Sequence, residues 1–311
     1  MQEQKYIVGI DVGGTFTDLL CLNTETQELL SEKVPSIPGS QWKGVLGALE
    51  QLGIDYAEIR AFVHGTTIAT NALLERKGAK TGLVTTDGFR DTLEIGRTRR
   101  LIGGLFDIKF VRPKPLVSRD LRIEVDERVA ADGTVLQSVD DVDFAPIVQQ
   151  FKDKGVEAIA VAFMNAYRNS ENEAKALEKI QALAGDVPVC ASTTVVPEKG
   201  EFERFSTCVL NAYLTPVVTT YLETLAAELE GQGIAAPVSV MGSNGGVMTL
   251  DQAAKFAAGT FLSGPVGGAG GAVRICEMAG VDDCITFDMG GTSTDVAQKS
   301  IFQEAKNKLI Y

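Results

Sequence analysis

Short apolar runs and amphipathic stretches alternate along most of the chain. Tyr6 to Leu22 predicts two strands around Gly13-Gly14, and Glu28 to Ser36 predicts a third strand. Beyond Ser40, apolar positions spaced by three and four residues predict a helix that ends at Gly53. Three strands followed by alternating helices and strands are typical of an α/β fold with a mixed sheet.

The alternation continues through the middle of the chain. The pattern predicts strands at 59–63, 81–86, 122–129, 135–139, 157–164, 187–192 and 237–241, and helices at 68–77, 140–155, 170–184, 198–229 and 250–258. Pro216 is expected to break or kink the longest helix near Leu214. Between 98 and 115 no period is visible, so an irregular loop or crossover is expected there.

The first strand pair carries candidate chemistry. Its first apolar run ends in Asp11, and the two glycines suit a hairpin that needs positive φ. Such a turn leaves N–H groups free to face an anion, with the hydroxyls of Thr15 and Thr17 beside them. Asp11 would hold the Mg²⁺ that phosphates also hold, usually through water. A Gly-Gly hairpin with an ordinary aspartate gives the same local pattern.

A second copy of this plan lies far downstream, in Cys284 to Ala297. It repeats the apolar strand, the acid, the glycine pair, the two threonines and the second acid at the same spacing: Asp288, Gly290, Gly291, Thr292, Thr294, Asp295. Two such hairpins predict two related lobes that face one phosphate. Neither is a dinucleotide fingerprint, because the glycines lead into a strand, nor a P-loop, because no lysine follows them.

Three further stretches are candidate ligand contacts. His64, the only histidine, ends a strand before Gly65, Thr66 and Thr67, where an acid/base group would be useful and where a structural histidine is equally consistent. Asn244, flanked by glycines, is a weaker candidate. The glycine-rich 262–271 stretch, with Gly264, precedes a helix and suits either an anion site or tight packing.

Composition narrows the possible partners. A net charge of −12 over 311 residues argues against nucleic acid or an anionic membrane as the main partner. The five cysteines are odd in number and form no CxxC pair, which fits a reducing compartment. No signal peptide and no bilayer-length apolar run are visible, so a cytoplasmic location is expected.

An ordered set of motifs carries a family resemblance. The segments GIDVGGTFTD, HGTTIATNALLERKGAKTGLVTTDGFRDTLEIGR, EFERFSTCVLNAYLTPVV, GSNGGV, FLSGPVGG and DMGGTSTDVA resemble the hydantoinase A/5-oxoprolinase family. The ATP-binding subunits of acetone and acetophenone carboxylases are similar. The resemblance runs from about Tyr6 to Ala297, nearly the whole chain.

The resemblance implies an actin-like ATPase with paired RNase H-like folds: an N-terminal lobe over residues 1–185 and an incomplete second lobe over 186–311. It implies two phosphate loops, made by Asp11, Gly13, Gly14, Thr15, Thr17 and Asp18, and by Asp288, Gly290, Gly291, Thr292 and Thr294. Asp11 and Asp288 would hold Mg²⁺, and His64, with Thr66 and Thr67, would lie beside the nucleotide cleft.

The implied activity is ATP-dependent opening of a cyclic amide or imide, with a hydantoinase B-type partner subunit. Carboxylation of a ketone is the alternative. One departure stands out, because the family's subunits are much longer and only Gln298 to Tyr311, a polar helix by its pattern, follows the second hairpin. A truncated or frame-shifted product, or a fragment, is expected, with exposed strand edges and with inactivity as an open alternative.

Overall fold

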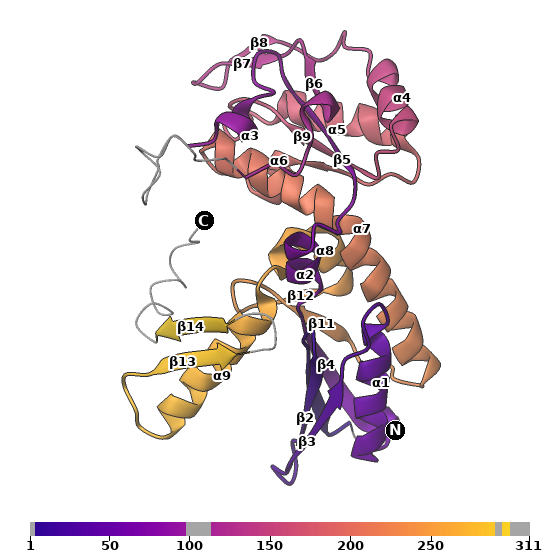
Figure 1. The fold of residues 1–311 in the computed structure, drawn as a ribbon, viewed down its shortest axis with the longest axis vertical. Coiled ribbons are helices and arrows are strands. Elements are labelled where there is room, and N and C mark those ends of the chain that lie inside the picture. The colour runs from indigo at the N-terminus through magenta and orange to yellow at the C-terminus, as the bar shows by residue number, and fades with distance from the viewer. Residues whose placement is uncertain (1–3, 98–112, 290–293, 299–311) are drawn as a thin grey trace. The chain divides into compact units, whose positions relative to one another are not determined.

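The computed structural model describes residues 4–97, 113–289 and 294–298. Contacts group the chain into two units, which we call unit 1 (residues 1–77 and 217–311) and unit 2 (residues 78–216). This grouping by contact differs from the predicted sequence boundary at residue 185, which stays a prediction. Figure 1 shows the elements of both units.

Unit 1 is built on a six-stranded mixed sheet with the order β12-β11-β4-β1-β2-β3. Strands β1, β4 and β11 are parallel neighbours, and the remaining pairs are antiparallel. The strands are β1 (Tyr6–Val12), β2 (Phe16–Asn23), β3 (Leu29–Pro35), β4 (Ile59–Thr66), β11 (Val238–Met241) and β12 (Val247–Thr249). The mixed α/β architecture agrees with the sequence pattern.

Helices and a second hairpin complete unit 1. Its helices are α1 (Gln41–Leu52), α2 (Ile68–Leu74), α8 (Leu250–Lys255) and α9 (Ser263–Met278), with 3-10 turns at Tyr56–Glu58 and Ala257–Thr260. Helix α1 contacts β1, β2 and β3, and Gly53 ends it in the left-handed region at φ 64°. Strands β13 (Ile285–Met289) and β14 (Thr294–Gln298) form a separate two-stranded sheet beside α9.

Unit 2 contains a four-stranded parallel sheet with the order β10-β9-β5-β6. Every residue of β5 (Thr81–Thr86) and β9 (Ala158–Ala162) is buried, as expected for a parallel sheet covered on both faces. The other elements are α3 (Thr92–Ile95), a 3-10 turn (Arg119–Leu121), β6 (Arg122–Val125), β7 (Arg128–Val129), β8 (Val135–Gln137), α4 (Ala145–Asp153), α5 (Glu171–Ala184), β10 (Val189–Ala191) and α6 (Ser192–Val195).

Helix α7 (Glu201–Gly231) shows that the expected break at Pro216 was wrong, while the alternative of a kink near Leu214 stays a prediction. It runs for 31 residues through Pro216 without a break. Pro216 instead marks the point where the chain passes from unit 2 to unit 1. The missing N–H removes one helical bond at that position, and the bonds on either side are enough to continue the helix.

Two other expectations fall mostly outside the described residues. These are the irregular loop at 98–115, described only from 113, and the polar helix after residue 298. Among the helices that the structure describes, none has the length and apolar character needed to cross a bilayer.

Candidate functional site

The turn of the first hairpin differs from the expected type. Gly13 and Gly14 are absent from the residues with positive φ, so the expectation of a left-handed turn was wrong. Gly13 is needed for another reason, because an ideal Cβ there would lie 3.0 Å from the carbonyl oxygen of Phe16. In the described part of the chain, no protein acceptor takes the N–H of Gly14 or Thr15. This exposed corner therefore offers two amide donors to an anion.

Asp11 lies on β1 against two glycines. Parallel pairing places Gly65 of β4 opposite Asp11, and an ideal Cβ on Gly65 would lie 2.9 Å from Asp11 Oδ1. The same construction on Gly264, in the first turn of α9, gives 3.2 Å to that oxygen. Side chains at either position would push on the carboxylate, so both glycines are required by close approach.

Asp288 lies near the same helix. An ideal Cβ on Gly268, one turn after Gly264, would lie 3.7 Å from Asp288 Oδ2. Asp18 is the cross-strand partner of Asp11, and it pairs with Lys33 at 2.8 Å. Asp11 keeps solvent access, yet surrounding protein atoms desolvate it, and this desolvation, with repulsion from Asp18 and Asp288, raises its pKa. The two predicted metal-binding aspartates therefore lie close enough to repel one another.

Hydrogen bonds fasten α9 to the end of β4. Ser263 Oγ donates to the carbonyl of Thr66 at 3.0 Å, and the N–H of Leu262 donates to Thr70 Oγ1 at 3.2 Å. Thr67 Oγ1 donates to the carbonyl of Val12 at 3.1 Å. These bonds tie together the three segments that surround Asp11.

His64 does not fit the expected acid/base role. Its side chain is fully buried, and Nε2 lies 2.9 Å from the hydroxyl of Tyr221 on α7. Burial lowers the pKa of His64 to about 3, so the ring is neutral at physiological pH. With no surface open to a substrate, His64 is better described as a structural neighbour of the site.

Two candidate threonines are also buried. Thr17 has no exposed surface, and its hydroxyl lies 3.0 Å from Ser36 Oγ. Thr66 is 1% exposed and its hydroxyl accepts from the N–H of Ile68. Neither placement fits contact with phosphate or substrate, because both hydroxyls face the interior.

The remaining candidates have mixed placements. Asn244 is exposed in the loop between β11 and β12, where its side-chain oxygen accepts from the N–H of Gly246 at 2.9 Å. Thr294 begins β14 and pairs with Met289. The predicted contacts Gly290, Gly291 and Thr292 lie outside the described residues.

The donor set fits a magnesium ion held largely through water. The described residues contain no group of three or more metal-ligating side chains, so a fully protein-coordinated site is not built here. Mg²⁺ typically uses one or two carboxylates and keeps several waters, which Asp11 and Asp288 can satisfy. A cation between them would also relieve the repulsion that raises the pKa of Asp11.

Sequence reasoning did not single out Gly65, Gly268, Ser263 or Tyr221 as parts of this arrangement. Gly65 and Gly268 lie within the HGTT and glycine-rich motifs of the sequence, so a close approach of the backbone to an acidic side chain could have been predicted there. Tyr221 lies in a long helix and 157 residues from His64, and nothing local marks it.

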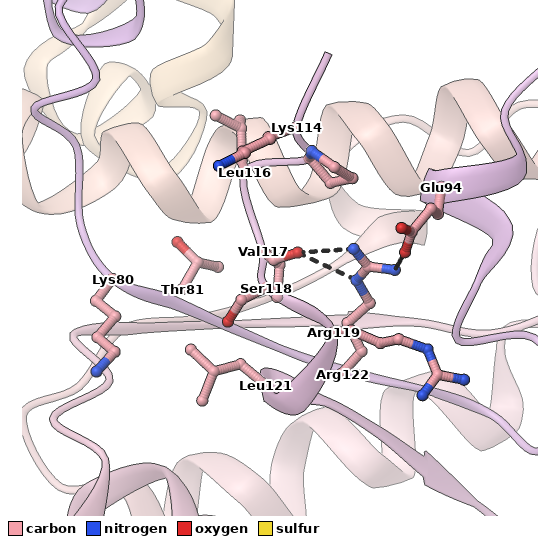
Figure 2. A pocket seen from close by; sticks show the side chains of 11 residues that line it. Lys80, Thr81, Glu94, Lys114, Leu116, Val117, Ser118, Arg119, Leu121 and Arg122 are labelled. Atoms are coloured by element: carbon pink, nitrogen blue, oxygen red, sulfur yellow. Dashed lines mark hydrogen bonds and ion pairs between the residues drawn. The ribbon is translucent and has the colours of Figure 1, made fainter. Parts of the chain in front are cut away.

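A separate pocket of about 340 Å³ lies in unit 2 and contains none of the predicted site residues. In Figure 2 the Arg122 guanidinium reaches the carbonyl of Val117 and the carboxylate of Glu94. The lining is part apolar and part cationic, and its bonds hold the chain entering β6.

The chain is similar in sequence to a known protein family and to several of its members. Residues 7–184 match the family described as hydantoinase/oxoprolinase N-terminal region, and residues 204–304 match hydantoinase/oxoprolinase. The caprolactamase subunit alpha of Pseudomonas jessenii is 35% identical over 304 residues, covering 95% of this chain and 44% of that subunit. The 5-oxoprolinase of Saccharomyces cerevisiae is 30% identical, covering 96% of this chain and 26% of that enzyme.

Solved structures agree on the fold. A nucleotide-free acetone carboxylase structure, from work on ATP-dependent acetone carboxylation, matches with a TM-score of 0.84 at 26% identity, covering 94% of this chain and 44% of that one. The predicted actin-like ATPase type of fold is thereby confirmed. The chain spans less than half the length of these relatives.

Proposed function

The chain belongs to the hydantoinase/oxoprolinase family, and on that premise we propose that it is the ATP-binding part of an amidohydrolase that opens a cyclic amide or imide. Hydantoin, 5-oxoproline and related lactams are the substrate class. One observation carries the proposal: two hairpins of the same sequence plan bring Asp11 and Asp288 to successive turns of α9.

The chemistry explains why ATP is needed. An amide carbonyl is a poor electrophile, because nitrogen donates electron density into it. Transfer of the γ-phosphoryl group to the carbonyl oxygen breaks the β–γ bond of ATP and makes that oxygen part of a leaving group. Water then attacks the carbon, and the C–N bond breaks as nitrogen takes a proton, which leaves an acyl phosphate. A second water hydrolyses the acyl phosphate to the carboxylate and inorganic phosphate. Such transfer depends mainly on positioning and charge neutralisation.

The residues of this chain would divide that work. The amides of Gly14 and Thr15 donate to phosphate oxygens, and Asp11 and Asp288 hold the metal ion. Mg²⁺, when bound, supplies the positive charge that phosphate oxygens require. Gly65 and Gly264 leave the space that the carboxylate of Asp11 occupies, because an ideal Cβ would lie 2.9 Å or 3.2 Å from Oδ1.

A ketone carboxylase subunit is the second candidate. The similarity to the acetone carboxylase structure, at a TM-score of 0.84 and 26% identity, supports it. Both activities need ATP at the same hairpins, so the choice lies in the substrate. A partner subunit of hydantoinase B type is proposed for either activity, since the caprolactamase relative is named as a subunit.

Binding of Mg-ATP is the first test. Calorimetry with the purified chain should give saturable binding, and Asp11→Asn should weaken it by about tenfold or more, because a charged metal ligand is lost. Asp282→Asn is the matched control, since Asp282 is exposed in unit 1 only six residues before Asp288. Binding that is insensitive to Asp11→Asn would remove the metal role.

Turnover is the second test and assigns the substrate. Phosphate release is measured with a partner subunit present, using 5-oxoproline, hydantoin and caprolactam in one series and acetone with bicarbonate in the other. Stimulation by a lactam supports the hydrolase. Stimulation only by acetone with bicarbonate supports the carboxylase, and no stimulation by either series contradicts both.

A further inference from the structure

A buried polar pair includes the residue that precedes Gly65, the cross-strand partner of Asp11. His64 on β4 and Tyr221 on α7 are 0% and 9% exposed, with 2.9 Å between Nε2 and the hydroxyl oxygen. Their ring centroids lie 5.5 Å apart, tilted by 34°. In the described part of the chain, His64 Nδ1 has no hydrogen-bond partner. The bond to Tyr221 is therefore the one polar contact known for this ring.

The register of the sheet connects this pair to the site. His64 stands on the central strand β4, opposite Ile10 of β1 on one side and Val240 of β11 on the other. The next residue is Gly65, which pairs with Asp11 across the strands and on which an ideal Cβ would lie 2.9 Å from Asp11 Oδ1. A shift of the His64 ring would therefore move the backbone that supports the carboxylate.

The ring acts as a neutral group. Burial lowers the pKa of His64 to about 3, so it carries no charge that a substrate or phosphate could use. Its contribution is a fixed shape and one hydrogen bond inside a closely packed interior, where even a small displacement is transmitted to neighbours. Removing the hydroxyl of Tyr221 would leave Nε2 unsatisfied as well as Nδ1.

We infer that Tyr221 is a positioning residue, which holds the His64 ring so that the adjacent Gly65 keeps its place beside the Asp11 carboxylate, the proposed ligand of the metal ion. The inference rests on the proposed function, because it assigns Asp11 to Mg-ATP. Tyr221 touches neither nucleotide nor metal in this assignment and acts through His64 and Gly65.

A matched pair of variants on one helix tests it. Tyr221→Phe removes the hydroxyl bonded to His64. Tyr213→Phe removes a hydroxyl that is equally buried on α7 and has no partner among the described residues. Tyr221→Phe should weaken Mg-ATP binding by about fivefold, through displacement of the carboxylate. Tyr213→Phe should leave the affinity unchanged.

Nuclear magnetic resonance supplies readouts that need no nucleotide. Because the chain has one histidine, labelled imidazole gives a single signal set, which should not titrate between pH 5 and 8 in the parent protein. In Tyr221→Phe that signal should move, and so should the amide signals of Gly65 and Gly264. In Tyr213→Phe none of them should move.

The outcomes separate the inference from the proposed function. Unmoved Gly65 and Gly264 signals in a folded Tyr221→Phe protein overturn the positioning role, as does an unchanged Mg-ATP affinity where the parent binds. If the signals move while the parent chain fails to bind Mg-ATP, Tyr221 still positions Asp11, and the proposed nucleotide role fails.

Discussion

Two hairpins of one sequence plan have opposite surroundings in this protein. In both, the backbone register pairs the two acidic positions across the strands, Asp11 with Asp18 and Asp288 with Asp295. The first hairpin lies between β3 and β4 in a six-stranded sheet. One of its faces is buried, with Ile10 4% and Leu19 1% exposed, whereas Phe16 and Leu20 are 45% and 50% exposed. The second is a two-stranded sheet whose apolar side chains are exposed: Ile285 72%, Phe287 65%, Met289 70% and Val296 61%.

The difference separates what local sequence decides from what tertiary contacts decide. Asp, two glycines and threonines at fixed spacing produce the same antiparallel register twice. Burial then differs, because β1 and β2 pair with β4 and β3 and contact α1, whereas β13 and β14 pair only with each other within the described residues. An isolated two-stranded hairpin is marginally stable in water, so the second hairpin depends on contacts beyond its own strands.

The largest expected effect comes from truncating one isoleucine in each hairpin. Ile10 is 4% exposed, and Ile10→Ala should reduce the free energy of unfolding by about 2–5 kcal/mol. Ile285 is 72% exposed, and Ile285→Ala should change it by less than about 0.5 kcal/mol. Trp42, the only tryptophan, lies in α1 against the first sheet, so its fluorescence during urea unfolding reports on unit 1.

A large loss in both variants would contradict the comparison. It would mean that the exposed face of β13 and β14 is covered in solution, by a second copy or by other polypeptide. Repeating the Ile285→Ala measurement over a range of protein concentrations distinguishes a second copy, because only self-association makes the stability depend on concentration.

The hairpin plan and the fold class were readable from sequence because they depend on short-range spacing. The direction of the Thr17 side chain could also have been predicted. Side chains alternate along a strand, so Thr17 points inward when its neighbour Asp18 faces solvent. The contact between Tyr221 and His64 was beyond local pattern, since it forms only when β4 and α7 pack together. A break at Pro216 was wrong because helix propensity is weaker than the contacts along a 31-residue helix.

A second prediction compares the glycines beside the two aspartates. Gly65→Ala would place a Cβ 2.9 Å from Asp11 Oδ1, so the carboxylate must move and Mg-ATP binding should weaken about tenfold. Gly268→Ala would place a Cβ 3.7 Å from Asp288 Oδ2, an ordinary contact inside helix α9. That variant should keep its affinity and gain about 0.5–1 kcal/mol from helix propensity. Calorimetry and urea unfolding measure the two effects.

The two glycine variants also show which side of the site is rigid. Equal losses of Mg-ATP affinity in Gly65→Ala and Gly268→Ala would indicate that Asp288 is held as tightly as Asp11. That result would contradict the wider 3.7 Å spacing between Asp288 Oδ2 and an ideal Cβ on Gly268. A normal affinity in Gly65→Ala would indicate that the Asp11 carboxylate is free to rotate away without cost.

The smallest expected effect concerns the charge of Asp11. Its pKa is raised from 3.8 by desolvation and by Asp18 and Asp288, so the folded state binds its proton more tightly than the unfolded state. Stability should therefore fall as pH rises from about 3.8 through the folded pKa. At pH 7 without nucleotide, Asp11→Asn should be more stable than the parent by about 0.5 kcal/mol, a small value because Asp11 keeps solvent access.

Asp288 of the second hairpin provides the control for this prediction. Asp288→Asn removes one of the charges that repel Asp11, so it should lower the pKa of Asp11, which carboxyl-carbon titration measures directly. Below pH 3.8 the advantage of Asp11→Asn should disappear, because both states of the parent are then protonated. A parent that is more stable than Asp11→Asn at pH 7 would mean that the carboxylate has a stabilising partner in the fold. The strain of two facing acids would then be absent, and with it the reason for a cation between the hairpins.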